Sequence, residues 1–151
     1  MSSASATRRE TWLPATPASA QAARSIVREA ATEVGLDGER LWDLMLASTE
    51  AVTNAVQHGK PWPNDCVLFT TEPCPRGLRV EVCDLGKFES ALEPAPLEAT
   101  SGRGMQIIAA LVDRLEVRNG GGPTRVRFEK HRPLPCRNGE HASGEEVLTV
   151  Q

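Results

Sequence analysis

Residues 41–59 place the tightest constraint on how this chain can fold. At helical period, apolar residues recur along one face, and Trp42, Leu46 and Ala51 extend the apolar character around the rest of the circumference. A helix that is apolar on nearly all sides is covered by more than one neighbour. The sequence therefore predicts a buried helix at the centre of the fold.

Glu50, Asn54 and His58 interrupt this helix at four-residue intervals. Residues four apart lie one above another on a helix, so the three side chains form a single polar stripe. A solvated face is the ordinary explanation, because charged residues are usually exposed. Such a face normally also carries Lys, Arg and further Glu, which are missing here. The stripe therefore favours a covered polar site.

The composition suits one domain with a real core. A chain of 151 residues buries roughly 68–70% of its unfolded surface without disulfides or metal. The 17 Lys and Arg nearly balance the 20 Asp and Glu, which favours neither a nucleic-acid nor a membrane surface. Without a long apolar run or a signal-peptide pattern, we expect a cytoplasmic protein.

The cysteines form no Cys-x-x-Cys pair and have no histidine cluster at zinc-ligand spacing. They are Cys66, Cys74, Cys83 and Cys136. We therefore expect reduced thiols rather than a cysteine metal site.

Periodicity and turn residues divide the chain into a flexible tail (1–10), a domain (11–130) and a second flexible tail (131–151). Gly35 is predicted to cap the helix before the central one. The expected elements are an edge strand at 11–13, helices at 20–34, 41–59 and 105–112, and strands at 67–71, 77–84, 115–118 and 124–129.

A long connection, residues 87–103, separates the strand that ends in Asp84-Leu85-Gly86 from the next helix. Loops of this length inside a domain are usually functional or disordered. The connection closes at Gly102-Arg103-Gly104, and a Gly-x-Gly turn at a helix N-terminus presents free N–H groups to an anion. A plain flexible loop is the commoner explanation of such a turn when it stands alone.

Taken in order, these motifs resemble the ATP-binding domain of the GHKL superfamily. The series is Glu50-x-x-x-Asn54-x-x-x-His58, Asp84-x-Gly86, Gly102-x-Gly104 and Thr124 after a glycine turn. The short single-domain form looks most like the anti-sigma-factor serine/threonine kinases of bacteria. The resemblance implies the GHKL (Bergerat) fold, an α/β (α+β) two-layer sandwich with helices on one face of a mixed, mostly antiparallel sheet.

The resemblance also implies roles for individual residues toward ATP and Mg²⁺. Asn54 would be the Mg²⁺ ligand, since a neutral carbonyl oxygen suits this ion. Glu50 would be the general base that accepts the proton of a protein hydroxyl or of water. Asp84 would accept a hydrogen bond from the exocyclic amine of adenine, and Gly86 would let the base approach the backbone.

The remaining implied contacts are with the phosphates and the base. Gly102, Arg103, Gly104 and Met105 would surround phosphate, with Arg103 offering charge, and residues 87–101 would form the lid. Thr124 would lie near the adenine. His58 would have a packing or phosphate-proximal role.

The implied partners are a sigma factor and an antagonist protein whose serine or threonine is phosphorylated, with a homodimer left open and no direct nucleic-acid or membrane contact. Lys87-Phe88 after Gly86, and Pro123 before Thr124, depart from the family's pattern. They leave a second hypothesis, a partner-binding module without ATP turnover. A third is a free-standing ATPase subunit that transfers phosphate to histidine.

Overall fold

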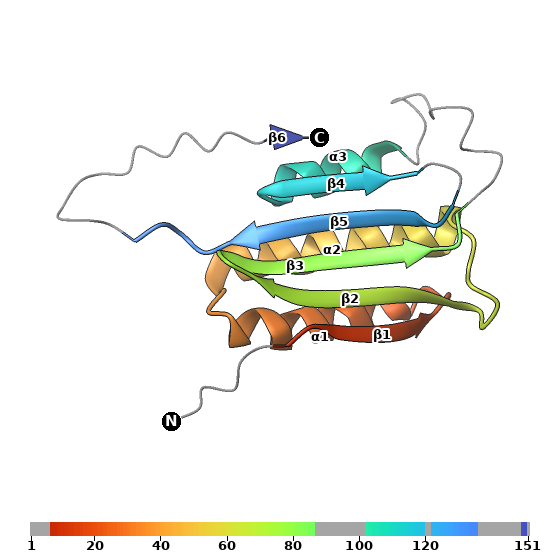
Figure 1. Cartoon of the computed structure of the whole chain (residues 1–151), viewed down its shortest axis with the longest axis horizontal. Coiled ribbons are helices and arrows are strands. Elements are labelled where there is room, and N and C mark those ends of the chain that lie inside the picture. The colour runs from red at the N-terminus through yellow and green to blue at the C-terminus, as the bar shows by residue number, and fades with distance from the viewer. Residues whose placement is uncertain (1–6, 87–101, 120–121, 136–148, 151) are drawn as a thin grey trace.

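Helices and sheet form two layers. In the computed structural model, which describes residues 7–86, 102–119, 122–135 and 149–150, three helices lie on one face of a six-stranded sheet (Figure 1). The helices are α1 (Ser19–Glu33), α2 (Gly38–His58) and α3 (Gly102–Leu111). The strands are β1 (Arg9–Pro14), β2 (Cys66–Cys74), β3 (Gly77–Asp84), β4 (Arg114–Arg118), β5 (Thr124–His131) and β6 (Thr149–Val150).

The strand order is β1-β2-β3-β5-β4-β6. Every neighbouring pair is antiparallel except β4 and β6, which run parallel. The predicted mixed, mostly antiparallel sheet with helices on one face is therefore confirmed. None of the helices in the described ranges is both long and apolar enough to cross a bilayer.

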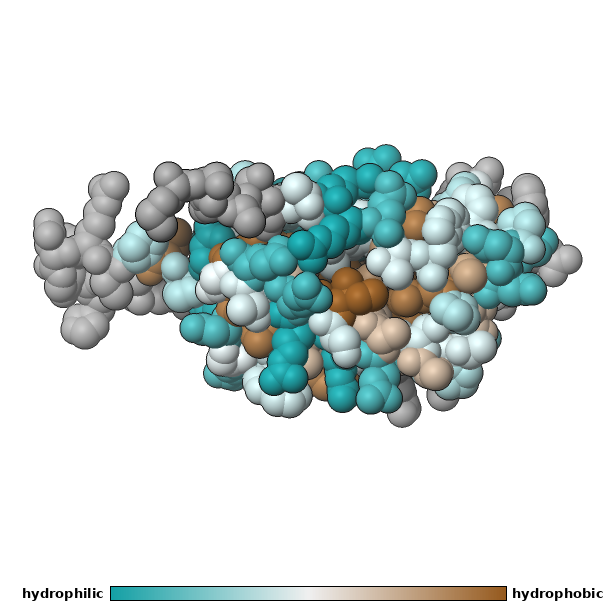
Figure 2. Space-filling model, turned by 90° about the horizontal axis from the view of Figure 1, so that it is seen from below, coloured by the Kyte–Doolittle hydropathy of each residue, from teal (hydrophilic) through white to brown (hydrophobic). Residues whose placement is uncertain are grey.

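The two faces of the sheet differ in chemistry because side chains alternate along a strand. Val80 pairs with Phe128 and Val82 with Val126, and all four are buried in the core beneath the helices. The residues between them face the other way and carry charge. Seen from the side of β1 and α1, the surface is largely hydrophilic, with hydrophobic atoms gathered in a small central area (Figure 2).

Gly35 ends α1 as predicted. Its φ of 82° lies in the left-handed region, and its N–H donates to the carbonyl of Thr32 at 3.1 Å. The N–H of Leu36 donates to the carbonyl of Ala31 at 2.9 Å. These two bonds satisfy carbonyls that the end of a helix leaves without partners.

Gly35→Ala is expected to lower the free energy of unfolding by about 1–2 kcal/mol, because a side chain in the left-handed region contacts its own backbone. Urea unfolding followed by circular dichroism measures this. Gly122→Ala is the control, since a Cβ there meets nothing within 4 Å. Equal stability of the two variants would contradict the prediction.

Several elements are longer than predicted. β2 runs on to Cys74 through Pro73, because β1 pairs only as far as Thr71 and the missing N–H of Pro73 therefore faces an unpaired edge. α2 begins at Gly38, in what we expected to be a loop. β5 continues to His131, and Thr149–Val150, from the predicted C-terminal tail, adds β6 beside β4.

Candidate functional site

The polar stripe of α2 is partly covered. Glu50 and Asn54 are half-buried, whereas His58, the last residue of the helix, is exposed. Nδ2 of Asn54 is buried and has no hydrogen-bond partner among the described residues. Glu50 likewise makes no hydrogen bond or ion pair with the described part of the chain. A buried amide without a partner is costly, so the Asn54 side chain suggests a bound ligand.

The first turn of α3 lies against Asn54. Gly104 is buried, and a Cβ added to it would overlap the Asn54 carboxamide. Only glycine allows so close an approach. We expected the Gly-x-Gly turn to precede the helix, but Gly102 and Gly104 lie within its first turn, followed by half-buried Met105. Of Arg103, the structure describes only its place in α3.

Lys130 on β5 fixes the position of α3 relative to α2. Its buried ammonium donates to Asp43 Oδ2 on α2 at 3.1 Å and to the carbonyl of Leu111, at the end of α3, at 2.7 Å. The opposite end of α3 reaches Asn54 through Gly104. The two helices therefore run in opposite directions, and the N–H groups at the N-terminus of α3 are brought to the polar stripe.

The end of β3 forms the second part of the site. Asp84 is only 6% exposed, and its Oδ1 accepts the N–H of Gly86 at 2.6 Å. A Cβ on Gly59, just after α2, would overlap Asp84 Oδ2. The carboxylate is thus held between the end of the central helix and the turn that follows the strand.

Gly86 and Thr124 lie together beside Asp84. Thr124 is the register partner of Asp84, and Gly86 has a φ of 82° with the backbone of Gly122 and Thr124 packed where a Cβ would stand. Glycine is required here on both counts. The contact holds although Pro123 departs from the family's pattern.

Sequence reasoning missed the connection between α2 and β2. Lys60 accepts the Leu85 N–H at 2.8 Å through its carbonyl, and Trp62 Nε1 donates to the Cys83 carbonyl at 3.2 Å. These bonds fix the end of β3 beside Gly59. A glycine and a Pro-rich turn after a helix ordinarily mark only the end of that helix. The sequence therefore contains no pattern that identifies these residues as part of the site.

The structure therefore brings most of the predicted residues together. Asn54 and Gly104 form one side, and Asp84, Gly86 and Thr124 form the other. The end of α2, from Asn54 to Gly59 beside Asp84, connects the two. The exposed His58 makes no contact with either side among the described interactions. The predicted lid, residues 87–101, lies outside the described residues.

The residues present fit a magnesium nucleotide. The two ends of a carboxamide are assigned from their hydrogen bonds, so the buried end of Asn54 can present an oxygen, which Mg²⁺ prefers. The first turn of α3 provides N–H groups suited to phosphate.

Comparison with known proteins agrees with this arrangement. Residues 13–130 match the model of the histidine kinase-like ATPase domain. The chain belongs to this family. The family resemblance inferred from the motifs is therefore confirmed.

The chain is also similar to named relatives and to a solved structure. The chain is 31% identical over 120 residues to an anti-sigma F factor of Thermoanaerobacter sp. strain X514, covering 72% of this chain and 82% of the relative. It is 32% identical over 117 residues to an anti-sigma F factor of Clostridium acetobutylicum, with the same coverage. A crystal structure of the RsbU and RsbW domains of a Mycobacterium tuberculosis protein superposes with a TM-score of 0.63 at 25% identity, covering 83% of this chain and 33% of that longer one.

Proposed function

We propose that this protein is a cytoplasmic, ATP-binding anti-sigma factor that phosphorylates a serine or threonine of an antagonist protein and so regulates transcription by partner exchange. The observation that carries the proposal is Asn54, whose buried carboxamide lacks a partner in the described chain and lies one turn from Glu50 and against Gly104. The names of the anti-sigma F factor relatives support the choice of partners.

Asp84 is suited to recognise adenine. Its Oδ1 is occupied by the Gly86 N–H, which orients the carboxylate to accept a hydrogen bond from the exocyclic amine. Gly86 leaves room for the base beside the backbone, and Thr124 lies against it. Adenine recognition therefore falls to the end of β3 and the beginning of β5.

Asn54 would hold Mg²⁺, which would neutralise charge on the phosphates. Gly102, Gly104 and Met105 would offer backbone N–H groups of the first turn of α3 to the phosphates, and Arg103 would add charge. We assign His58 a packing or phosphate-proximal role at the exposed end of the stripe.

Glu50 is suited to be the general base. Its carboxylate accepts the hydroxyl proton of the antagonist's serine or threonine as that oxygen bonds to the γ-phosphorus of ATP. The bond from the γ-phosphorus to the bridging oxygen breaks, and ADP leaves. Because Glu50 has no ion-pair partner among the described residues, no described cation competes for the proton-accepting oxygen.

The second candidate is a module of the same fold that holds a sigma factor or antagonist without ATP turnover. Pro123, between Gly122 and Thr124, is the observation that favours it. In both cases the partners are proteins. The proposal also includes a homodimer, in which two copies of this chain pair.

Calorimetric titration with Mg·ATP and Mg·ADP tests the proposal. The wild-type chain is expected to bind both, and Asp84→Asn is expected to bind about 10–100-fold more weakly, because a hydrogen bond to a charged group is worth about 1.5–3 kcal/mol. Asp65→Asn is the matched control, since Asp65 is exposed and Asn tolerates its φ of 59°. If the wild-type chain binds neither nucleotide, the proposal of kinase activity is wrong, and the partner-binding module is favoured.

A further inference from the structure

Three potential metal ligands converge on the sheet face opposite the helices. The Cys74 sulfur, a Glu129 carboxylate oxygen and a His131 ring nitrogen all lie within 4.8 Å of one another. Gly77, beside this cluster, and Asp84, in the candidate nucleotide site, stand at opposite ends of β3. The two ends are about 23 Å apart at the usual rise of a strand. The cluster is therefore separate from the site described above.

The register of the sheet brings these residues together. Cys74 on β2 pairs with Gly77 on β3, and Gly77 pairs in turn with His131 on β5. Gly77 carries no side chain, so nothing on β3 separates Cys74 from His131. Glu129, two residues before His131 on the same strand, points to the same face. No sequence spacing could reveal the cluster, because its members come from strands far apart in the chain.

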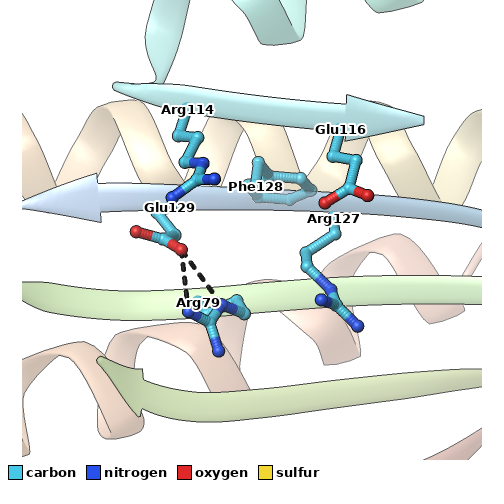
Figure 3. Close-up of a pocket in the computed structure, with 6 residues that line it drawn as sticks. All are labelled: Arg79, Arg114, Glu116, Arg127, Phe128 and Glu129. Atoms are coloured by element: carbon cyan, nitrogen blue, oxygen red, sulfur yellow. Dashed lines mark hydrogen bonds and ion pairs between the residues drawn. The ribbon is translucent and has the colours of Figure 1, made fainter. Parts of the chain in front are cut away.

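Arg79 orients the glutamate of the cluster. Its Nε and Nη2 both donate to Glu129 Oε2, at 3.0 and 2.9 Å (Figure 3). The other oxygen, Oε1, lies 2.9 Å from His131 Nε2. The carboxylate thus turns one oxygen to the arginine and the other to the cluster, which is the supporting arrangement that metal-binding carboxylates commonly have.

We propose that Cys74, Glu129 and His131 bind a zinc ion. Sulfur, imidazole nitrogen and carboxylate oxygen are the ligands that Zn²⁺ takes in proteins. Oxygen and nitrogen ligands of one tetrahedral zinc ion stand about 3.3 Å apart, so Oε1 and Nε2 need to separate only slightly. The described residues supply three ligands, and water takes the fourth position.

Zinc binding requires the Cys74 thiol to lose its proton, because the thiolate is the ligand. Burial, and then the charge of Glu129, raise the pKa of the Cys74 thiol. Burial also works to raise the pKa of Glu129, but hydrogen bonds from His131 and Arg79 hold it below its ordinary value. As the sulfur–zinc bond forms, the sulfur–hydrogen bond breaks and the proton passes to solvent.

The ion would join the two strands that flank β3. At the same end of the sheet, Arg132 donates through its N–H to the Arg76 carbonyl at 2.7 Å and through Nη2 to the Pro75 carbonyl at 3.1 Å. The turn between β2 and β3 is already held against the end of β5, and zinc adds a link between β2 and β5 themselves. An ion in this position would therefore hold β2 and β5 together across β3.

Titration of the metal-free, reduced chain of 151 residues with zinc chloride tests the proposal. One zinc per chain is expected, together with a rise in Tm. Cys74→Ser and His131→Gln are each expected to weaken binding at least about tenfold, since even residues that only support a ligand contribute about 10–100-fold. Cobalt should report the thiolate by an intense near-ultraviolet absorption that Cys74→Ser removes.

Cys66→Ser is the matched control, because Cys66 is another half-buried thiol on β2. It should bind zinc as the wild type does, and so should Asn54→Ala, which lies in the nucleotide site. Circular dichroism establishes that each variant is folded, and His131→Gln replaces Cys74→Ser as the deciding variant if the latter unfolds. Absence of zinc binding by the wild type, or equal binding by folded Cys74→Ser and His131→Gln, would overturn the proposal.

Discussion

Glu50→Gln is expected to lower the rate of phosphate transfer to the antagonist protein by about 10²–10⁴-fold, the usual contribution of a general base. Glutamine keeps the shape of the side chain but cannot accept the hydroxyl proton. Affinity for Mg·ATP should remain nearly unchanged, because the proposed nucleotide contacts belong to other residues. Glu50 is half-buried, so the variant should also remain folded.

Transfer of radiolabelled γ-phosphate to the antagonist, with calorimetry of Mg·ATP binding in parallel, separates the two effects. Glu39→Gln is the matched control, since Glu39 is an exposed glutamate in the first turn of the same helix, and its transfer rate should equal that of the wild type. Unchanged transfer in Glu50→Gln would remove Glu50 from the role of base. Label that acid releases from the product would identify phosphohistidine and favour the third hypothesis.

The fold was predictable from the sequence because its central elements have strong periodicity. The apolar periodicity of α2 and the alternation in β3 located both elements, and β3 occupies Gly77–Asp84 as expected. The expectation of apolar cover around the whole of α2 was wrong at Trp42 and Leu46, which are exposed. The ends of helices and strands that lack a periodic pattern were predicted less accurately. Pro73 suggested a loop, but it lies in β2 where no strand pairs on its other side, a circumstance that only the three-dimensional pairing reveals.

The candidate site was predictable in its residue types but not in its contacts. Asn54 and Gly104 belong to separate motifs, and their direct contact depends on how α3 packs against α2. Gly59 has an ordinary explanation as a helix end, yet it leaves the space that the Asp84 carboxylate occupies. Likewise, Cys74 and His131 meet only because both flank the side-chain-free Gly77. Contacts of this kind depend on register between strands, which local sequence does not encode.

Asn54→Ala is expected to abolish the Mg²⁺-dependent part of ATP affinity, a loss of about 10–100-fold by analogy with other residues around metal ions. The same change should not destabilise the free protein. A buried polar atom without a partner costs about 1–3 kcal/mol, and alanine is the better helix former by about 0.5 kcal/mol. Against these gains stands the small space that the missing carboxamide leaves beside Gly104.

We therefore expect the free energy of unfolding of Asn54→Ala without nucleotide to equal or exceed that of the wild type, by up to about 1–2 kcal/mol. Urea unfolding measures this, and calorimetry with and without EDTA measures the Mg²⁺-dependent affinity. Gln57→Ala, an exposed carboxamide on the same helix, should change neither. Stability that is kept while binding is lost would mean that Asn54 serves the ligand rather than the fold. A less stable variant that still binds Mg·ATP would make Asn54 a packing residue and leave the proposed site without its metal ligand.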